Sequence, residues 1–326
     1  MSEGTLTSVI ICTRNRAASL ARCLRSISNM ELPKDSSWEV VVVDNGSSDH
    51  TLEVIKSFES KIPIRHVFEE IPGVSIARNT GVRTAKGTYI CWADDDVEVC
   101  KKWLTSYLAA FNLYPDGAYF SSKILPVFEG VTPQWLNDNM DVLHVLYAHK
   151  DLGDELRPLT NDGTEDPYNA NCAFKREWQL RFPYHPDLGL SPQFRRLGEE
   201  TAVFRAIKAA GGQGYWVPGA GVDHHIPQSR QTLDSVTTYQ KSVGETWAAL
   251  TDLGMDNFMG PPLERKGRLL FGAPIWLWRL ALVTYANQSV NIIRNGKGSS
   301  LQPIMKHAYY KGALDYLIRT RRKLKG

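Results

Sequence analysis

The sequence is poor in cysteine, and the arrangement of the few cysteines excludes two kinds of structure. Its 326 residues include five cysteines, an odd number, and no two of them are spaced as Cys-x-x-Cys. This pattern argues against a disulfide framework and against a zinc site, and it is typical of a reducing compartment. The first 30 residues also lack a basic start followed by an apolar core, so we expect no signal peptide and a cytoplasmic protein.

The sequence also lacks the glycine-rich motifs that cradle phosphates. It contains no G-x-G-x-x-G after an apolar run and no G-x-x-x-x-G-K-[ST]. A dinucleotide-binding fingerprint and a P-loop are therefore both excluded. Hydrophobic residues make up 43% and charged residues 22% of the chain, as in ordinary globular proteins, and the length allows one large domain or two.

Charge is distributed unevenly along the chain. The overall formal charge is only +3, but residues 265–326 contain 13 Lys or Arg against one acidic residue, a net charge of +12. The first 264 residues consequently carry a net charge of −9. A mildly acidic body with a strongly basic tail suggests that the tail meets an anionic partner.

Short apolar runs alternate with amphipathic segments in the first part of the chain. One such segment carries Leu20, Leu24 and Ile27 at helical spacing. Because the apolar runs are continuous rather than alternating, they predict a mostly parallel sheet covered by helices on both faces, an α/β fold. The runs cover residues 7–12, 38–43, 64–68, 88–93 and 118–122.

Three consecutive carboxylates, Asp94, Asp95 and Asp96, follow the apolar run that ends at Ala93. In an open α/β sheet, ligands bind at the carboxyl ends of the strands. A cation would relieve the repulsion among the three charges, and hard divalent ions prefer oxygen ligands. The alternative is an acidic loop or the start of a helix, where aspartate is also favoured.

An apolar run at residues 269–286 lies within the basic tail. It has 18 residues and is interrupted by Pro274 and Arg279, whereas a spanning helix needs about 20 apolar residues with few charges. Its aromatic residues are of the types favoured at a membrane interface, namely Trp276, Trp278 and Tyr285. Cations flank the run at Arg265, Lys266, Arg268, Arg294 and Lys297, and more follow in residues 319–325.

This pattern predicts a helix that lies in the plane of an anionic membrane surface. Residues 231–326 would then form a helical, basic and aromatic extension, peripheral on the inner face of the cell membrane. The alternative is a buried aromatic helix docked on the rest of the protein. Nucleic acid ranks below lipid as a partner, because the tail has no nucleic-acid-binding motif.

Four motifs follow one another in the first hundred residues. They are Val9–Arg16 (VIICTRNR), Val41–Asp49 (VVVDNGSSD), Pro72–Asn79 (PGVSIARN) and Ala93–Asp96 (ADDD). Their order and spacing resemble those of the family 2 glycosyltransferases with the GT-A fold. The resemblance covers roughly residues 7–230, with a nucleotide-binding half at about 1–115 and an acceptor-binding half at about 116–230.

The resemblance implies a nucleotide-sugar donor, most simply a UDP-sugar, and a Mg²⁺ or Mn²⁺ ion. The implied metal ligands are Asp96, Asp94 and His224, with His225 as the alternative to His224. Asp44 would hold the uracil or the ribose. The implied donor-binding residues are Thr13, Arg14, Asn15, Arg16, Asp44, Asn45, Ser47, Arg78, Asn79, Asp94 and Asp95.

Gly198-Glu199-Glu200 stands where the family often has Gly-Glu-Asp, whose last acid serves as the catalytic base. Glu200 is therefore the candidate base, and Glu199 is the alternative. Acidic residues also complement the dipole in the first turn of a helix, so the pair has a purely structural interpretation as well. One base and one metal imply a single displacement that inverts the anomeric centre, unlike the carboxylate pair of a retaining glycosidase.

The acceptor is expected to be a glycan or a lipid-linked sugar, bound by the irregular region 131–196. The sequence leaves two other functions open. A sugar-phosphate nucleotidyltransferase would usually carry a glycine-rich basic loop after the first strand, and Thr13–Arg16 contains no glycine. A non-catalytic nucleotide-sugar-binding module would not need the intact set of acidic residues.

Overall fold

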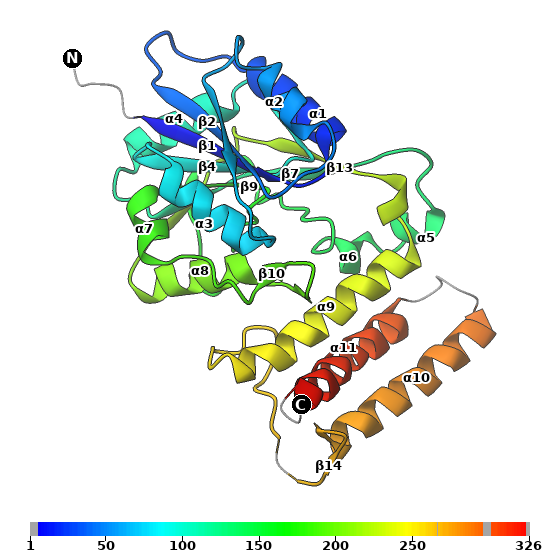
Figure 1. Ribbon diagram of the computed structural model, residues 1–326. Helices are drawn as coiled ribbons and strands as arrows, with labels where there is room; N and C mark the ends of the chain where they lie inside the picture. The colour runs from blue at the N-terminus through cyan, green and yellow to red at the C-terminus, as the bar shows by residue number, and fades with distance from the viewer. Residues whose placement is uncertain (1–5, 266, 296–300, 324–326) are drawn as a thin grey trace. The chain divides into compact units, whose positions relative to one another are not determined.

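A computed structural model of the chain describes residues 6–265, 267–295 and 301–323. These residues divide into two compact units (Figure 1). The first unit comprises the residues up to Val127 together with Tyr147–Pro192 and Glu199–Ile226, and the second comprises Phe128–Leu146, Gln193–Gly198 and the chain from Pro227 onward. The domain boundary predicted at residue 230 stays a prediction.

The first unit is built on an eight-stranded sheet in the order β3–β2–β1–β4–β9–β6–β12–β8. Strands β3, β2, β1 and β4 run parallel to one another, and β6 runs parallel to β12. Strand β9 is antiparallel to β4 and β6, and β8 is antiparallel to β12. The predicted mostly parallel α/β fold is therefore confirmed. The strands are β1 (Thr7–Thr13), β2 (Trp38–Asp44), β3 (Ile64–Phe68), β4 (Tyr89–Ala93), β6 (Tyr119–Ser121), β8 (Arg157–Pro158), β9 (Asn171–Lys175) and β12 (Gly214–Trp216).

Helices cover both faces of this sheet, which explains why its strands are continuously apolar. In β1, Val9 and Ile11 pack into one core, while Ile10 between them packs into the other. The first core includes residues of α1 (Ala17–Ser28), α2 (Thr51–Lys56) and α4 (Trp103–Leu113). The second includes residues of α3 (Val74–Thr84) and α8 (Glu199–Ala209), with α7 (Arg176–Arg181) packed against it.

Strand β9 is the one sheet strand in the middle of the order that the sequence analysis did not predict. It follows a region of scattered Pro, Gly, Asp and Asn residues, and its own sequence, NCAFK, is short and mixed. Its place between β4 and β6 comes from pairings such as Cys91 with Ala173, which no local pattern reveals. A smaller sheet joins β5 (Val97–Val99), β13 (Val222–Ile226) and β7 (Ile124–Phe128), and β10 covers Gly189–Leu190.

The second unit contains three long helices, α9 (Leu233–Asp252), α10 (Ile275–Asn295) and α11 (Gln302–Lys323), with α11 packed on both of the others (Figure 1). Its core includes Trp247, Leu277 and Leu317. The shorter elements are α5 (Gln134–Asn137), α6 (Met140–Leu143), β11 (Arg195–Arg196), the 3-10 turn Gln228–Arg230, β14 (Leu269–Leu270) and β15 (Ala273–Pro274).

The sequence analysis expected the apolar run 269–286 to form one helix, but only the part from Ile275 onward is helical. Its first residues form a β14–β15 hairpin, because Gly272 adopts a φ of +92° in the turn. Helix α10 begins only at Ile275. Among the described residues, no helix is both long and apolar enough to cross a membrane. The predicted cations Lys266 and Lys297, and the last of the basic residues from 324 onward, lie outside the described residues.

Helices α9 and α11 pack at very close range through two glycines. A Cβ atom on Gly244 would lie 1.8 Å from the Tyr309 carbonyl oxygen, and one on Gly312 would lie 2.0 Å from the Lys241 carbonyl oxygen. Backbone atoms cannot yield as the end of a side chain can. Only glycine is therefore compatible with this helix pair as it is packed.

We expect Gly244→Ala to lower the free energy of unfolding by about 3 kcal/mol or more, because the added methyl group forces α9 and α11 apart. Urea unfolding of the purified protein measures the change. Gly221→Ala is the control, since a Cβ there would meet nothing closer than 3.6 Å. Equal stability of the Gly244 variant and the wild type would show that the two helices are not packed this closely.

Candidate active site

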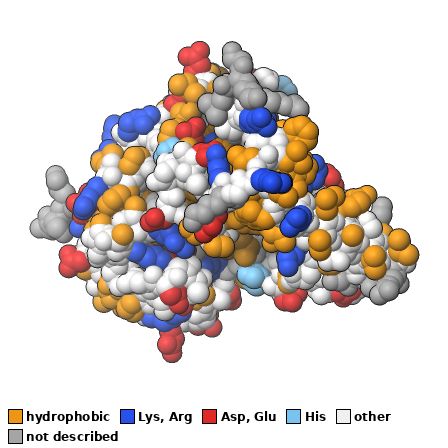
Figure 2. Space-filling model, turned by 90° about the horizontal axis from the view of Figure 1, so that it is seen from below, with side chains coloured by type: hydrophobic (Ala, Val, Ile, Leu, Met, Phe, Trp, Pro, Cys, Tyr) orange, Lys and Arg blue, Asp and Glu red, His pale blue; other side chains and the backbone are white. Residues whose placement is uncertain are grey.

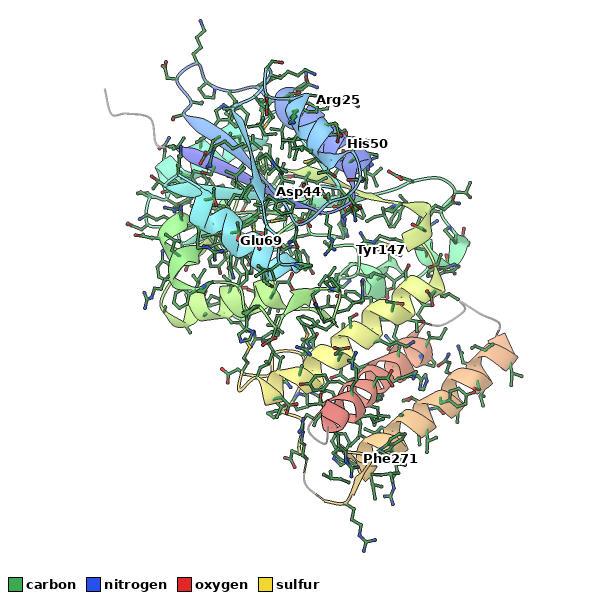
Figure 3. The ribbon with its side chains drawn as sticks, viewed as in Figure 1. Arg25, Asp44, His50, Glu69, Tyr147 and Phe271 are labelled. Carbon is green, nitrogen blue, oxygen red and sulfur yellow. The ribbon has the colours of Figure 1, made fainter. Side chains whose placement is uncertain are left out.

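The polar residues that follow β1, β2 and β4 meet at one edge of the sheet. Thr13 and Asp44, the last residues of β1 and β2, are register partners. Asp44 is labelled in Figure 3. The Thr13 hydroxyl donates a 2.7 Å hydrogen bond to Asp95 Oδ2, just beyond the end of β4. The edge thus brings together three of the four motifs, as expected for the carboxyl ends of parallel strands.

Arg16 joins the loop after β1 to the acidic triplet. Its Nη1 lies 2.8 Å from Asp95 Oδ1 and its Nη2 lies 2.7 Å from Asp96 Oδ2. Burial raises the pKa of Asp95 to about 7, against the attraction of Arg16. Burial acts in the same direction on Asp96, but there His224 and Arg16 outweigh it and lower the pKa. Adjacent carboxyl groups therefore differ in proton affinity.

His224 is brought to Asp96 by the pairing of β13 with β5, in which His224 lies opposite Val97. Its Nε2 is 3.5 Å from Asp96 Oδ2, and its Nδ1 is 2.9 Å from the Tyr147 carbonyl oxygen. That carbonyl can only accept, so Nδ1 carries a proton and Nε2 is the ring nitrogen that faces Asp96. Successive strand residues face opposite ways, and His225 Nε2 accordingly lies 3.3 Å from Glu98 Oε1 instead.

The chemistry of these donors fits a divalent cation. Carboxylate oxygens suit Mg²⁺ and Mn²⁺, an imidazole nitrogen is a common metal ligand, and the carbonyl behind His224 is the usual outer partner of a ligating histidine. Asp94 has 41% of its side-chain surface exposed, and Asp96 Oδ2 is held by Arg16. Within the described part of the chain, no three Cys, His, Asp or Glu side chains gather closely enough to hold an ion.

Arg78, on α3, links the acidic triplet to the start of α8. It is 7% exposed, and its Nη1 lies 2.6 Å from Glu199 Oε1 while its Nη2 lies 3.7 Å from Asp94 Oδ1. Burial alone would lower the pKa of Arg78, but the carboxylates of Glu199 and Asp94 more than offset it and the pKa is raised. Arg78 is therefore charged throughout the physiological range.

The two glutamates of α8 have different surroundings. Glu199 is ion-paired with Arg78, whereas Glu200 Oε2 accepts a 2.9 Å hydrogen bond from the backbone N–H of Asn169. Burial, together with the charge of Glu199, raises the pKa of Glu200 to about 8. A carboxyl group with a pKa close to neutrality is suited to exchanging protons with a substrate.

Several of the predicted donor-binding residues use their side chains to shape the loops. Asn15 Oδ1 accepts from the Ser48 backbone N–H at 2.7 Å, and Ser47 Oγ accepts from the Asn15 backbone N–H at 2.9 Å. Asn45 is buried and binds the backbone of the segment after β3, including the Gly73 N–H at 2.8 Å. These contacts hold the loops after β1 and β2 against each other.

The remaining predicted residues differ in exposure. Asp44 is 4% exposed, and its Oδ1 accepts the Ser47 N–H at 2.8 Å while its Oδ2 lies 3.5 Å from His66 Nε2. Arg14 is exposed. Asn79 binds both the N–H and the carbonyl oxygen of Tyr184, at 2.9 and 2.8 Å. The role of each residue in donor binding stays a prediction.

Asn169 and Tyr184 lie beside the glutamate pair, and the sequence analysis did not identify them. Asn169 stands at the end of a region without regular apolar spacing, and Tyr184 follows a short helix in another loop. Nothing local marks either one as a partner of Glu200. Buried polar groups need hydrogen-bond partners, but only the folded structure shows which partner each of them has.

Comparison with known proteins identifies the family. Residues 8–180 match the profile of Glycosyl transferase family 2. The succinoglycan biosynthesis protein ExoM of Rhizobium meliloti is 24% identical over 249 residues, which cover 74% of this chain and 73% of that protein. The validoxylamine A glucosyltransferase of Streptomyces hygroscopicus is 39% identical over 111 residues, 33% of this chain but only 26% of that enzyme.

Solved structures share the fold. A mannosyltransferase from Pyrobaculum calidifontis, in complex with GDP-Man and Mn²⁺, superposes with a TM-score of 0.57 and 18% identity, covering 97% of this chain and 88% of that one. Residues 1–349 of S. aureus TarS give a TM-score of 0.53 and 17% identity, covering 97% and 91%. Because the profile match spans more than half of the sequence, the chain belongs to glycosyl transferase family 2 and is a glycosyltransferase with the GT-A fold.

Proposed function

We propose that the protein transfers a sugar from a nucleotide sugar, with UDP as the nucleotide, to a hydroxyl group of a glycan or lipid-linked acceptor, with inversion at the anomeric carbon. The observation that carries this proposal is a continuous chain of charged contacts. Arg16 joins the loop after β1 to Asp95 and Asp96, and Arg78 joins Asp94 to Glu199, the neighbour of Glu200 on α8. Donor-binding and proton-accepting groups thereby share one site.

Glu200 is the proposed base. In a single displacement, the acceptor oxygen forms a bond to the anomeric carbon as the bond from that carbon to the diphosphate oxygen breaks. The acceptor proton passes to Glu200, and the nucleoside diphosphate leaves with the electron pair. Glu199 is less suited to this role, because Arg78 is held 2.6 Å from its Oε1.

Asp96, Asp94 and His224 would hold a Mg²⁺ or Mn²⁺ ion. Such an ion acts as a Lewis acid that stabilises charge on the departing diphosphate. Arg16 and Arg78 lie against two of the same carboxylates and would add positive charge beside a diphosphate bound there. TarS has been crystallised with UDP and with UDP-GlcNAc, and the Pyrobaculum enzyme with GDP-Man. These complexes support a nucleotide-sugar donor, and they differ in whether its nucleobase is uracil or guanine.

Turnover of purified protein with a panel of nucleotide sugars, with and without Mn²⁺, tests the proposal. We expect release of UDP from at least one UDP-sugar when a suitable glycan acceptor is present. Binding of nucleotide sugars without any turnover would favour a non-catalytic binding role instead. NMR of the product reports the anomeric configuration, and retention would contradict the single displacement.

We further propose that the second unit docks on an anionic membrane surface, which would place the enzyme beside a lipid-linked acceptor and at the inner face of the cell membrane. The support is an exposed apolar surface on α10 and the β14–β15 hairpin. Phe271, at the hairpin turn, is 61% exposed (Figure 3), and Ile293, near the end of α10, is 81% exposed. We call the following residues the apolar face: Leu269, Leu270, Phe271, Leu282, Val283, Val290 and Ile293.

The apolar face is a true helix face and not a scatter of single residues. Leu282, Val290 and Ile293 recur at helical spacing on one side of α10, while Leu277 and Ala281 on the other side are buried in the core of the unit. Arg265, Arg268 and Arg279, which flank or interrupt these apolar residues in sequence, are exposed. Figure 2 shows hydrophobic side chains, with Lys and Arg among them, on the face of the molecule that it draws.

The charge of the tail favours lipid over a second copy of the chain. Residues 265–326 carry a net charge of +12, so two copies brought together through this region would repel each other, whereas an anionic surface would attract each of them. A helix with an exposed apolar side and flanking cations matches the requirements of an in-plane membrane helix.

We expect the full chain to bind vesicles that contain 30% phosphatidylglycerol and not vesicles of phosphatidylcholine alone. Val290→Ser with Ile293→Asn should weaken binding at least about tenfold, because two apolar side chains no longer enter the interface. Flotation at low salt measures binding. Leu113→Ser is the control, since Leu113 is also exposed (59%) but lies outside the apolar face.

Two outcomes would contradict membrane docking. One is equal vesicle binding by the wild type and the double variant. The other is a dimer in solution, seen by light scattering, that the double variant abolishes, because a second copy would then cover the apolar face.

A further inference from the structure

We infer that Tyr184 is a positioning residue that fixes both glutamates of α8, holding Glu200 through Asn169 and Glu199 through Arg78. The inference rests on the proposed role of Glu200 as base. Tyr184 is 1% exposed and lies in the loop after α7, far in sequence from Asn169 and Arg78. Its hydroxyl is hydrogen-bonded to Asn169, and its ring contacts Arg78.

The direction of the hydrogen bonds in this network is fixed by the indole of Trp92. Trp92 Nε1 can only donate, and it donates to Gln179 Oε1 at 2.8 Å. Gln179 must therefore turn its NH₂ group to the Tyr184 hydroxyl, also at 2.8 Å. The Tyr184 hydroxyl, which accepts that bond, donates its own proton to Asn169 Oδ1 at 3.0 Å.

This chain fixes Asn169 next to the base. The same residue that accepts from Tyr184 donates its backbone N–H to Glu200 Oε2 at 2.9 Å. Asn169 is 1% exposed, and its Nδ2 has no hydrogen-bond partner among the described residues. Its side chain is thus held through Oδ1, by the Tyr184 hydroxyl and by a 3.5 Å contact from the Cys172 thiol.

The ring of Tyr184 acts on the other glutamate. The Arg78 guanidinium carbon lies 5.5 Å from the ring centroid, at cation–π distance, and the same guanidinium binds Glu199. The backbone of Tyr184 is in turn clamped at both its N–H and its carbonyl oxygen by Asn79. One side chain therefore supports Glu200 by its hydroxyl and Glu199 by its face.

Loss of the Tyr184 hydroxyl should change the surroundings of Glu200 more than those of Glu199. Tyr184→Phe keeps the ring against Arg78 and against Trp92, whose ring centroid is 6.0 Å away, and removes only the acceptor for Gln179 and the donor to Asn169. Asn169 is then free to turn, and its N–H loses its fixed direction towards Glu200. The titratable groups that act on or face Glu200 are Glu199, Arg78, Asp94, Tyr168, Tyr184, Lys150 and Cys172.

The test compares Tyr184→Phe with wild type in steady-state turnover of the nucleotide sugar. We expect kcat to fall roughly 10- to 100-fold with the donor KM unchanged, as for lost orientation of a catalytic group. We also expect the pH of half-maximal kcat to rise, because the Asn169 N–H that favours ionised Glu200 is no longer held in place. Tyr119→Phe is the control, since Tyr119 packs in the same core and its buried hydroxyl has no hydrogen-bond partner in the part of the chain that the structure describes.

The outcomes separate this inference from the proposed function. If Glu200→Gln abolishes turnover but Tyr184→Phe leaves both kcat and the pH profile unchanged, Tyr184 does not position the base. If Glu200→Gln itself retains full turnover, the assignment of Glu200 as base is wrong. Urea unfolding at pH 6 and pH 9 gives a readout without turnover, because the stability difference between Tyr184→Phe and the Tyr184→Phe/Glu200→Gln double variant reports the ionisation of Glu200 directly.

Discussion

Replacing Glu200 by glutamine is expected to lower kcat by about 10²–10⁴-fold while leaving the KM for the donor unchanged. Glutamine keeps the size of the side chain and can still accept from the Asn169 N–H, so the loss would come from the missing proton acceptor. Initial rates at saturating donor measure the effect. Glu199→Gln is the matched comparison, and a large loss of kcat confined to that variant would transfer the role of base to Glu199.

The same substitution should stabilise the folded protein at alkaline pH. An unfolded glutamate titrates near 4.5, whereas Glu200 in the folded protein titrates at about 8. Between these values the folded state holds a proton that the unfolded state has lost, so stability falls as the pH rises from 4.5 to 8. Glutamine does not titrate, and the Glu200→Gln variant should therefore gain about 4 kcal/mol over wild type at pH 8 and less than about 1 kcal/mol at pH 4.5. A gain that does not depend on pH would show that the Glu200 pKa is not raised.

Replacing Asp96 by asparagine is expected to lower kcat at least about 10²-fold and to remove the response of activity to Mn²⁺. Asparagine keeps the shape of the side chain but lacks the negative charge, and the charge is what a divalent ion and Arg16 both require. Calorimetric titration of UDP with and without Mn²⁺ separates the loss of the metal from the loss of the contact with Arg16. The variant should lose the metal-dependent part of UDP binding.

The control for Asp96→Asn is Asp223→Asn, which removes an exposed carboxylate one residue from His224 on β13. That variant should behave as wild type. Asp96→Asn should also remain folded, because Arg16 keeps its 2.8 Å contact with Asp95. Turnover of Asp96→Asn that is still stimulated by Mn²⁺ would contradict the assignment of Asp96 as a metal ligand.

The sequence was informative wherever chemistry and local pattern coincide. The continuous apolar runs predicted strands β1 to β4, because residues such as Val41 and Val42 are both buried, on opposite faces of one sheet. The polar residues at the ends of these strands were consequently expected at one edge, and the contact between Thr13 and Asp95 agrees with that expectation.

The sequence was least informative where a structure depends on contacts between distant segments. Strand β9 has five residues and an unremarkable composition, and only its two neighbours define it. The same holds for Tyr184, whose importance comes from four partners in three other parts of the chain. The hairpin at residues 269–274 was missed for a different reason, since an apolar run with one glycine and one proline is compatible with a helix or a turn.

The antiparallel direction of β9 has a consequence for the order in which a newly made chain can complete its site. The parallel strands β1, β2 and β4 can pair as soon as they leave the ribosome. Arg78 and Glu199, however, are 121 residues apart. Strand β9, which precedes α8 in sequence, must first take its place beside β4. Until then the acidic residues after β4 stay open to water and Arg78 lacks its main partner. Nascent chains halted before residue 199 should therefore lack the Arg78–Glu199 ion pair and His224, so that the site can be completed only after α8 and β13 have been made.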